Sequence, residues 1–338
     1  MSQAAAKVRL EDLDIKPYVI TKLKMAGIQS VFDLAISIPH QLVDIGGGML
    51  TGTDEHVALE LVTKAKKALV DSGLLFKDFS TAQDILDRRK NLLRCTTGSA
   101  KLDSFLKGGI ETQAITEIAG EFGSGKSQIC YTLCVTANTP LDMKGLGGNV
   151  IFIDTENTFR SERIFQIAEH RGISPDEILR RIYVCKIYNT SHLEMIIQDL
   201  GKSIEEYKAK LVIVDSIIAL HRAEFTGRGT LADRQQRLNI MLHKLSRLAE
   251  VHNIAVVATN QVQSQPDDFF AGGNGLRPTG GNVMAHGCTY RILLRKAGHT
   301  RVAIIIDSPY HMYDQTRFAI AEAGVQDVYQ SETSTSEW

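Results

Sequence analysis

The clearest chemical feature of this sequence is a glycine-rich run that ends in lysine and serine. It reads Gly120-Glu121-Phe122-Gly123-Ser124-Gly125-Lys126-Ser127 and is followed by Gln128. Glycines let a backbone wrap around a polyphosphate, whose negative charge then faces successive N–H groups and the start of the next helix. Lys126 would reach the β- and γ-phosphate oxygens, and Ser127 would bind Mg²⁺ through its hydroxyl. The alternative is an ordinary glycine-rich turn, but the complete pattern favours binding of ATP or GTP.

Carboxylates follow two other apolar runs. The run Leu211–Asp215 ends in a side chain that could orient Mg²⁺ through water. The run Ile151–Asp154 also ends in a carboxylate, and Glu156 just beyond it could polarise the water that attacks a γ-phosphate. The alternatives are a turn cap for Asp215 and a salt bridge for Glu156. A nearby phosphate site favours the chemical roles.

A neutral amide, Gln261, stands near the end of a further apolar run. An amide in this position can hydrogen-bond a γ-phosphate. The next segment, Val262–Asn282, is rich in Gly, Asp, Gln and Pro, and long loops inside compact domains are usually functional. If Gln261 contacts the γ-phosphate, the nucleotide state is felt at the start of this loop. The alternative is a disordered surface insertion.

A second candidate loop, His221–Arg237, follows the carboxylate at Asp215. It contains glycines, the aromatic Phe225 and four arginines, which are Arg222, Arg228, Arg234 and Arg237. Arginine can bridge phosphates with two hydrogen bonds, and glycine allows close approach to a backbone, so this composition suits a groove for single-stranded nucleic acid. The alternative is a solvated helix start, because runs of charge are usually solvated faces.

Strand-like and helix-like runs alternate from about Thr97 onward. The expected strands are Ala114–Ile118, Val150–Asp154, Ile182–Cys185, Leu211–Asp215 and Ala255–Thr259. The expected helices are the one after the phosphate loop, Ser161–Arg171, Ser191–Tyr207 and Leu231–His252. This alternation predicts an α/β fold with a mostly parallel, doubly wound sheet. Ligands of such sheets bind beyond the carboxyl ends of the strands, so the residues named above should meet there.

The ends of the chain differ from this pattern. Residues 1–76 are expected to form a small all-helical domain, broken at Pro17, Gly27, Pro39 and Gly46-Gly47-Gly48. A linker at 77–96 contains a short helical pattern at Ala82–Arg89. The core is expected at 97–324, where Cys288–Arg295 and Arg301–Asp307 should form an antiparallel hairpin around Gly298. Residues 325–338 read as a polar tail.

Composition limits the class of protein. The formal net charge is -1, so any nucleic-acid binding must rely on local basic loops. No run is long and apolar enough to span a bilayer. The cysteines form no C-x-x-C pair and follow no apolar signal segment, which indicates a reducing intracellular compartment. They are Cys95, Cys130, Cys134, Cys185 and Cys288.

With these motifs in view, the sequence resembles the RadA-type DNA strand-exchange recombinases, the archaeal branch of the RecA family that also includes the eukaryotic recombinases. The resemblance covers about Asp78 to Gly324. It rests on five motifs in the family's order and spacing, namely Ile110–Glu117, the loop GEFGSGKS, Asp154–Arg160, Gly227-Arg228-Gly229 with Arg234-Gln235-Gln236, and Thr259–Gln263.

The resemblance implies a RecA-like P-loop NTPase core after a helix-hairpin-helix-like domain, and it implies a role for each matching residue. Glu156, Lys126 and Gln261 would be catalytic, with Ser127 and Asp215 at the metal. Arg163 would stack on adenine, while Asp307 and Pro309 would cap the ATP of a neighbouring protomer. DNA would contact Arg222, Phe225, Arg228, Arg234, Gly280 and Gly281. Phe79 and Ala82 would form an F-x-x-A tether for polymerisation.

The implied activity is that of an ATP-dependent recombinase that forms filaments on single-stranded DNA, pairs it with homologous duplex DNA and exchanges strands in recombinational repair. ATP and Mg²⁺ would be its cofactors, with a monovalent cation such as K⁺ left open. Expected partners are single- and double-stranded DNA, further copies of the chain in filaments or rings, and recombination mediators, but no membrane. The expected location is the cytoplasm or nucleoid of an archaeon or the nucleus of a eukaryote.

Two other functions stay open from sequence. One is an ATP-binding paralogue or mediator that regulates filaments without strand exchange, and the other is a small-molecule kinase. Three departures from the family pattern also stand out. Asp14–Tyr18 lacks the usual Gly-hydrophobe-Gly hairpin of a helix-hairpin-helix domain, and only Ile45–Gly48 resembles one. Ser161 replaces a proline, and His311–Thr316 replaces an acidic, proline-containing stretch after Pro309.

Overall fold

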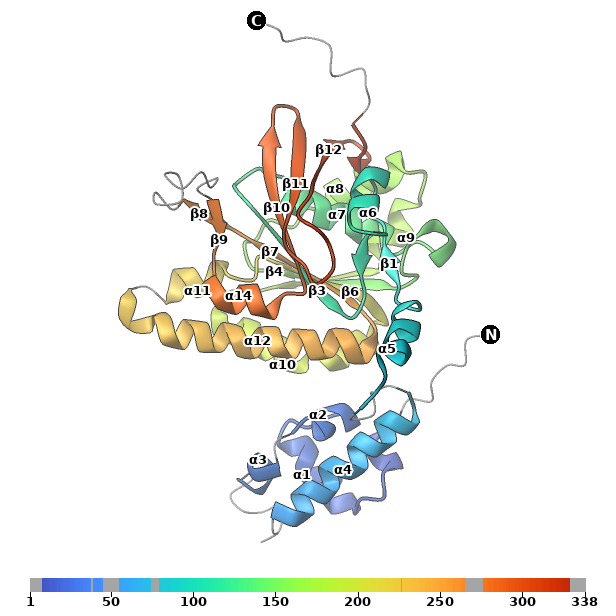
Figure 1. The fold of residues 1–338 in the computed structure, drawn as a ribbon, viewed down its shortest axis with the longest axis vertical. Helices are drawn as coiled ribbons and strands as arrows, with labels where there is room; N and C mark the ends of the chain where they lie inside the picture. Colours follow the sequence, from blue (N-terminus) through green and yellow to red (C-terminus); the bar gives the residue numbers. More distant parts are fainter. Residues whose placement is uncertain are drawn as a thin grey trace, which may run out of the picture. The chain divides into compact units, whose positions relative to one another are not determined.

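The computed structural model describes residues 8–37, 39–44, 55–73, 79–225, 227–264 and 276–328. The chain divides into two compact units, Met1–Asn91 and Leu92–Trp338, the first helical and the second an α/β unit (Figure 1). Within the described residues, no helix has both the length and the apolar composition needed to cross a membrane.

Short helices build the first unit, as the sequence predicted. Proline begins α1 and α3, because its fixed φ suits the first helical turn. Gly27, at φ +87°, ends α1 in the left-handed conformation that glycine adopts without strain. The fully buried Leu23, Leu34 and Ala65 form its core. The elements are η1 (Leu10–Asp12), α1 (Pro17–Met25), α2 (Val31–Ala35), α3 (Pro39–Asp44), α4 (Glu55–Asp71) and α5 (Ala82–Arg89). The expected break at Gly46-Gly47-Gly48 lies outside the described residues.

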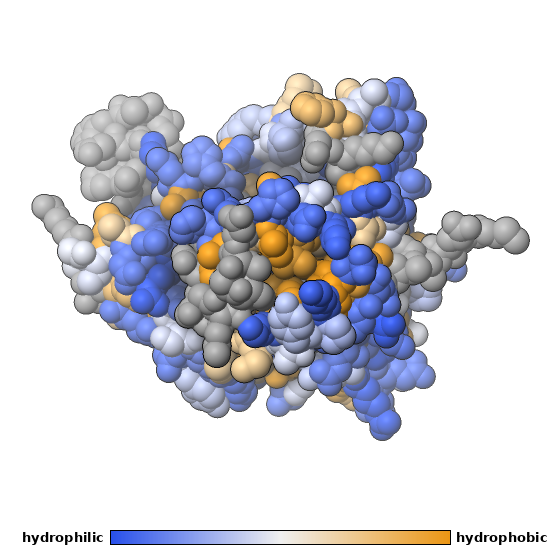
Figure 2. All heavy atoms as spheres, turned by 90° about the horizontal axis from the view of Figure 1, so that it is seen from below, coloured by the Kyte–Doolittle hydropathy of each residue, from blue (hydrophilic) through white to orange (hydrophobic). Residues whose placement is uncertain are grey.

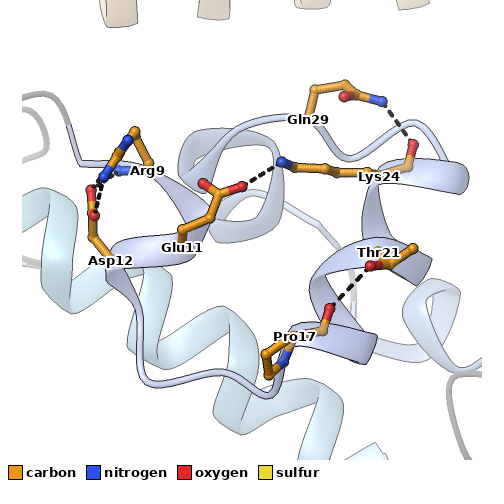
Figure 3. Close-up of polar contacts among 7 residues, drawn as sticks. All are labelled: Arg9, Glu11, Asp12, Pro17, Thr21, Lys24 and Gln29. Carbon is orange, nitrogen blue, oxygen red and sulfur yellow. Dashed lines mark hydrogen bonds and ion pairs between the residues drawn. The ribbon is translucent and has the colours of Figure 1, made fainter.

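Polar contacts fix the start of this unit (Figure 3). Arg9 and Asp12 pair across η1 at 3.0 Å, and Lys24 of α1 contacts Glu11 of η1. The side chain of Gln29 donates to the Lys24 carbonyl oxygen at 2.7 Å, which fixes the turn after α1. The ion pairs are exposed and therefore contribute little to stability.

The same unit carries an apolar groove of about 380 Å³. Ile15, Tyr18, Val19, Leu42 and Leu61 lie among its lining residues. Figure 2, which views the molecule from below, shows apolar side chains gathered within a rim of hydrophilic ones.

Helix α5 follows the residues proposed as a tether. Thr81 caps it, since its hydroxyl accepts from the Asp84 N–H at 3.1 Å and Asp84 bonds back to Thr81. The short helix predicted at Ala82–Arg89 is therefore confirmed, and none of its residues is buried. Phe79, just before it, has 95% of its side chain exposed.

A nine-stranded sheet organises the second unit. Its strand order is β13-β12-β11-β10-β3-β7-β6-β4-β5, and the six strands from β10 to β5 are parallel. This confirms the predicted α/β class with a mostly parallel sheet. The predicted strands are β3 (Ala114–Gly120), β4 (Asn149–Asp154), β5 (Ile182–Lys186), β6 (Ala209–Asp215) and β7 (Ala255–Asn260).

Helices cover both faces of this sheet (Figure 1). Alternate residues of β6 enter different cores: Leu211 and Ile213 join one, and Val212 and Val214 join the other. The first core contains α6 (Ala100–Phe105), α7 (Lys126–Thr136), α8 (Ser161–His170) and α9 (Pro175–Leu179). The second contains α10 (Thr190–Glu206), α12 (Leu231–His252) and α14 (Gly281–Gly287). Three smaller elements are η2 (Leu141–Met143), α11 (Ala219–Glu224) and η3 (Arg228–Thr230).

Antiparallel strands extend the sheet on one side. The predicted hairpin forms as β10 (Tyr290–Ala297) and β11 (Thr300–Asp307). The sequence did not reveal β12 (Gln315–Ala321) and β13 (Gly324–Gln326), which pair next to it, so the sheet continues past residue 324. Two separate small ladders are β1 (Arg94–Cys95) with β2 (Ile110–Glu111) and β8 (Val262–Ser264) with β9 (Leu276–Pro278).

Phe318 attaches β12 to the core, because its side chain is fully buried against the first face of the sheet. We expect Phe318→Ala to destabilise the α/β unit by ~3–5 kcal/mol and to lower its melting temperature by roughly 10 °C. Arg317→Ala, a change to the exposed neighbour, should stay within about 0.5 kcal/mol of the parent. Calorimetry of the full chain measures both, and equal melting of the two variants would contradict this account.

Candidate nucleotide site and nucleic-acid loops

The phosphate loop joins the end of β3 to the start of α7. Gly125 is the N-cap of α7 and has φ +107°. The first N–H groups of α7 have no partner within the helix, so they are free to bind an anion at the loop. A Cβ on Gly120 would lie 2.5 Å from Ser124 Oγ and 2.8 Å from the Leu294 carbonyl oxygen. Only glycine fits there.

Lys126 folds back over this loop. Its ammonium donates to the carbonyl oxygens of Gly120 (2.8 Å) and Glu121 (3.0 Å). Burial lowers the pKa of Lys126, while the nearby Asp215 and Glu156 act in the opposite sense. The ammonium therefore bonds to two carbonyl oxygens of the loop, and two carboxylates lie close enough to favour its charged form.

Ser127 and Asp215 lie together as the proposed metal site requires. Ser127 Oγ donates to Asp215 Oδ2 at 2.8 Å, and the Thr259 hydroxyl donates to Asp215 Oδ1. Burial raises the pKa of Asp215, although these two hydrogen bonds oppose the rise. Hydroxyl and carboxylate oxygens are hard donors that suit Mg²⁺ shared with phosphates and water. Within the described part of the chain, no group of three or more His, Cys, Asp or Glu side chains is arranged so that it could hold a metal ion by itself.

The two acids that follow β4 have different surroundings. Asp154 is aligned with Asp215 across β4 and β6, and its carboxylate accepts the backbone N–H groups of Glu156, Thr158 and Phe159 at 3.1–3.2 Å. Asp154 thus fixes the turn that carries Glu156. Glu156 Oε1 accepts from the hydroxyl of Ser216, the residue after Asp215, at 2.7 Å.

Gln261 connects this site with both loops. Its Nε2 donates to Glu156 Oε1 at 3.2 Å, and its Oε1 accepts from Arg222 Nη1 at 3.0 Å. Its backbone oxygen accepts from the Thr279 N–H at 2.9 Å, next to the β8–β9 stem that closes the long loop. Buried Asn260 also bonds Thr279 through its side chain. Both ends of that loop are therefore attached to the edge of the sheet.

The end of the long loop lies beside the arginine-rich loop. A Cβ on Gly280 would come within 2.9 Å of Ile218, which precedes α11, and one on Gly281 would lie 3.9 Å from the side chain of Gln235 on α12. The structure thus places Gly280 and Gly281 beside the segments on either side of the arginine-rich loop. Residues 265–275 of the long loop lie outside the described residues.

The arginine-rich loop has internal contacts of its own. Phe225 stacks against the buried His221, with ring centroids 6.2 Å apart, and Arg237 lies 5.3 Å from the Phe225 ring. Arg237 also forms ion pairs with Glu194 and Asp233. Its guanidinium is therefore engaged by other residues of the same chain. Arg234 is half-buried on α12. The backbone of Arg228 lies in η3, and its side chain is outside the described part.

Arg163 lies next to the phosphate loop. Its Nε donates to Gln128 Oε1 at 2.9 Å, and its other nitrogens bond to carbonyl oxygens of Ala321 and Glu322. Burial lowers the pKa of Arg163. The guanidinium is thus fixed near the start of α7, where a base could stack on its face.

Asp307 and Pro309 point away from the phosphate loop of their own chain. Strand β11 is antiparallel to β10, with Asp307 opposite Arg291, so the chain after Asp307 moves toward the amino ends of the parallel strands. His311 there packs on Tyr290 at the start of β10. The topology separates the proposed cap from its own nucleotide site.

Sequence reasoning missed several hydroxyl groups at this edge. Ser216 orients Glu156, Thr259 bonds Asp215, and Thr155 fixes Ser216 through bonds of 2.7 and 2.9 Å. Each lies directly beside a residue that was singled out. Only their position next to those residues in the sequence could have pointed to them, because serine and threonine are common at strand ends.

The raised pKa of Asp215 sets a pH test. Folding favours the neutral form of the Asp215 carboxyl, because its pKa is higher in the folded than in the unfolded chain. The neutral carboxyl's contribution to the free energy of unfolding is fully present below the unfolded pKa, near 3.9, and is lost as pH rises through the folded pKa. We expect Asp215→Asn, without nucleotide or Mg²⁺, to be about 1 kcal/mol more stable than the parent at pH 7 and about equal to it near pH 4. Urea unfolding measures this difference, and exposed Asp142→Asn is the control. A variant no more stable than the parent at pH 7 would disprove the account.

Comparison with known proteins agrees with this geometry. A model of the Rad51 family matches residues 88–328. The chain is 47% identical over 320 residues to the DNA repair and recombination protein RadA of Cenarchaeum symbiosum (strain A), an alignment that covers 94% of this chain and 79% of that protein. The chain therefore belongs to the Rad51 family.

Proposed function

We propose that this protein is an ATP-dependent DNA strand-exchange recombinase that forms filaments on single-stranded DNA. Membership of the Rad51 family makes it a RecA-type DNA recombinase of recombination and repair. The carrying observation is that Gln261 contacts Glu156 through its side chain and the base of the long loop through its backbone. Nucleotide chemistry and a candidate DNA loop thus share one residue.

Each group at the site has a proposed role in ATP hydrolysis. Lys126 and the phosphate loop would hold the triphosphate, with Arg163 on the adenine. Ser127 and Asp215 would hold Mg²⁺, which would neutralise charge on the phosphates when bound. Glu156 would accept a proton from the attacking water, held in place by its bond from Ser216.

DNA binding is proposed for the two loops that meet near Gly280 and Gly281. With an overall formal charge of -1, attraction to phosphates must come from local arginines such as Arg222, Arg228 and Arg234. Phe225 would offer an aromatic surface for a base, and such stacking is worth roughly 1–3 kcal/mol per base. Single-stranded DNA is the proposed first partner.

Self-assembly is proposed from two features of the chain. Phe79 is almost fully exposed, and Ala82 follows at the start of α5, so this segment can present an apolar anchor to another copy. Strand β5 ends the sheet order and so offers an edge for strand addition. Asp307 and Pro309 would then cap the ATP of the neighbouring copy.

The alternative of a regulatory paralogue without strand exchange is less favoured. The RadA relative aligns with almost the whole chain, and the chain keeps both Glu156 and Gln261 in mutual contact. A joint-molecule assay with one labelled oligonucleotide and homologous duplex DNA tests the proposed function. Joint molecules that need ATP support it, and their absence with ATP and Mg²⁺ present would overturn it.

Lys126→Ala should abolish DNA-dependent ATP turnover, because the triphosphate loses its central cation. Glu156→Gln keeps the size of the side chain but cannot accept the proton, and should lower the turnover rate by about 10²–10⁴-fold with little loss of ATP binding. Phosphate release and binding of a fluorescent ATP analogue measure the two effects. The exposed Glu162→Gln serves as the control, and normal turnover by Glu156→Gln would contradict the assignment.

Phe79→Ala should weaken filament formation, since an anchor buried between copies typically contributes 2 kcal/mol or more, equivalent to roughly a 30-fold loss of affinity. Electron microscopy and light scattering with single-stranded DNA and an ATP analogue measure assembly. Met25→Ala removes another highly exposed apolar side chain from the helical unit and should leave assembly intact. Filaments of normal length from Phe79→Ala would exclude the proposed tether.

A further inference from the structure

The side chain of Gln261 lies between groups that belong to different parts of the site. It donates to Glu156 at 3.2 Å and accepts from Arg222 at 3.0 Å, while Ser216 holds the same Glu156 oxygen at 2.7 Å. A continuous chain of hydrogen bonds therefore runs from the proposed catalytic acid to α11, where the arginine-rich loop begins.

We propose that Arg222 is a positioning residue that holds the Gln261 amide on Glu156 until a DNA phosphate takes its guanidinium. The inference rests on the proposed function, because it requires both DNA in the loop and ATP at the phosphate loop. It adds a route from the first loop to the nucleotide, separate from the covalent link between Gln261 and the long loop.

The bonds of the amide are the first argument. A glutamine side chain has one carbonyl oxygen and one NH₂ group, and here each is engaged by a charged partner. The NH₂ group has a second hydrogen, but the amide is planar, so these two bonds fix the direction of that hydrogen, and any rotation of Gln261 toward a γ-phosphate also disturbs its bond from Arg222. The arrangement therefore restrains Gln261 and occupies an oxygen of Glu156.

The strength of the competing bonds is the second argument. A guanidinium bound to a phosphate can form two parallel hydrogen bonds in which both the donor and the acceptor are charged. The amide oxygen of Gln261 offers Arg222 a single neutral acceptor. A DNA phosphate can therefore displace Gln261 from Arg222, and the released amide becomes able to turn.

The surroundings of Arg222 fix its backbone and leave its side chain as the moving part. Glu224 accepts the backbone N–H of Thr190 at 2.8 Å, which attaches α11 to the start of α10. His221 is fully buried and stacks on Phe225. Arg222 itself is only half-buried, so its guanidinium can exchange partners without movement of the helix.

The test compares Arg222→Gln with the parent chain in ATP hydrolysis, without DNA and with increasing single-stranded oligonucleotide. We expect DNA-free turnover to rise about tenfold, as for loss of one hydrogen bond to a charged group, and stimulation by saturating DNA to fall by the same factor. Arg222→Lys, which keeps a positive donor, should restore part of the restraint. Arg247→Ala removes an exposed arginine from α12 and should change neither rate.

A second measurement does not depend on turnover. The preference for a non-hydrolysable ATP analogue over ADP reports contact with the γ-phosphate, and it should increase about tenfold in Arg222→Gln without DNA. A variant that only damaged the fold would bind both the ATP analogue and ADP more weakly. If Arg222→Gln does not melt as a folded protein, the smaller increases expected for Arg222→Lys carry the test.

The outcomes separate this inference from the proposed function. If the parent is stimulated by DNA, but Arg222→Gln keeps the parent's DNA-free rate, maximal rate and nucleotide preference, Arg222 is a DNA contact only and the inference is overturned. If the parent itself shows no stimulation by any single-stranded oligonucleotide, the proposed function fails and the inference fails with it.

Discussion

The parallel alignment of neighbouring strands is the constraint on which the site depends. Because β3, β7, β6 and β4 run in one direction, their carboxyl ends place residues from distant parts of the sequence at one edge. The register sets Asp154 beside Asp215, and Asn260 beside Ala119 just before the phosphate loop. Three consequences follow from that alignment: a lysine beside two carboxylates, a hydroxyl bonded to a buried acid, and an amide within reach of a glutamate.

An amide suits position 261 better than a charged side chain would. Gln261 donates to the carboxylate of Glu156 and accepts from the guanidinium of Arg222 in the same conformation. A carboxylate there would repel Glu156, and an ammonium would repel Arg222. Only a group that is both donor and acceptor can join an acid and a base while remaining able to bond a phosphate.

Much of this arrangement could be predicted from sequence, for identifiable reasons. The phosphate loop is a motif whose backbone geometry follows from its glycines, and the long apolar runs before Asp215 and Gln261 permit only buried strands. Strand β12 escaped prediction because Gln315–Ala321 is polar at several positions and is held in the sheet by pairing, by the buried Phe318 and by the partly buried Ile320. The hydroxyl of Ser216 escaped because its role depends on the position of Glu156, which is distant in sequence.

The topology also separates Asp307 and Pro309 from the phosphate loop of their own copy of the chain. Strand β11 reverses direction relative to β10, so it carries Asp307 and Pro309 toward the edge of the sheet opposite the phosphate loop. No small movement of a loop can bring them back, because β11 is paired on both sides, with β10 and β12. If these residues act on ATP at all, they act on that of another copy. The nearly full exposure of Phe79 fits the same requirement, since a large apolar side chain is best stabilised when a second molecule covers it.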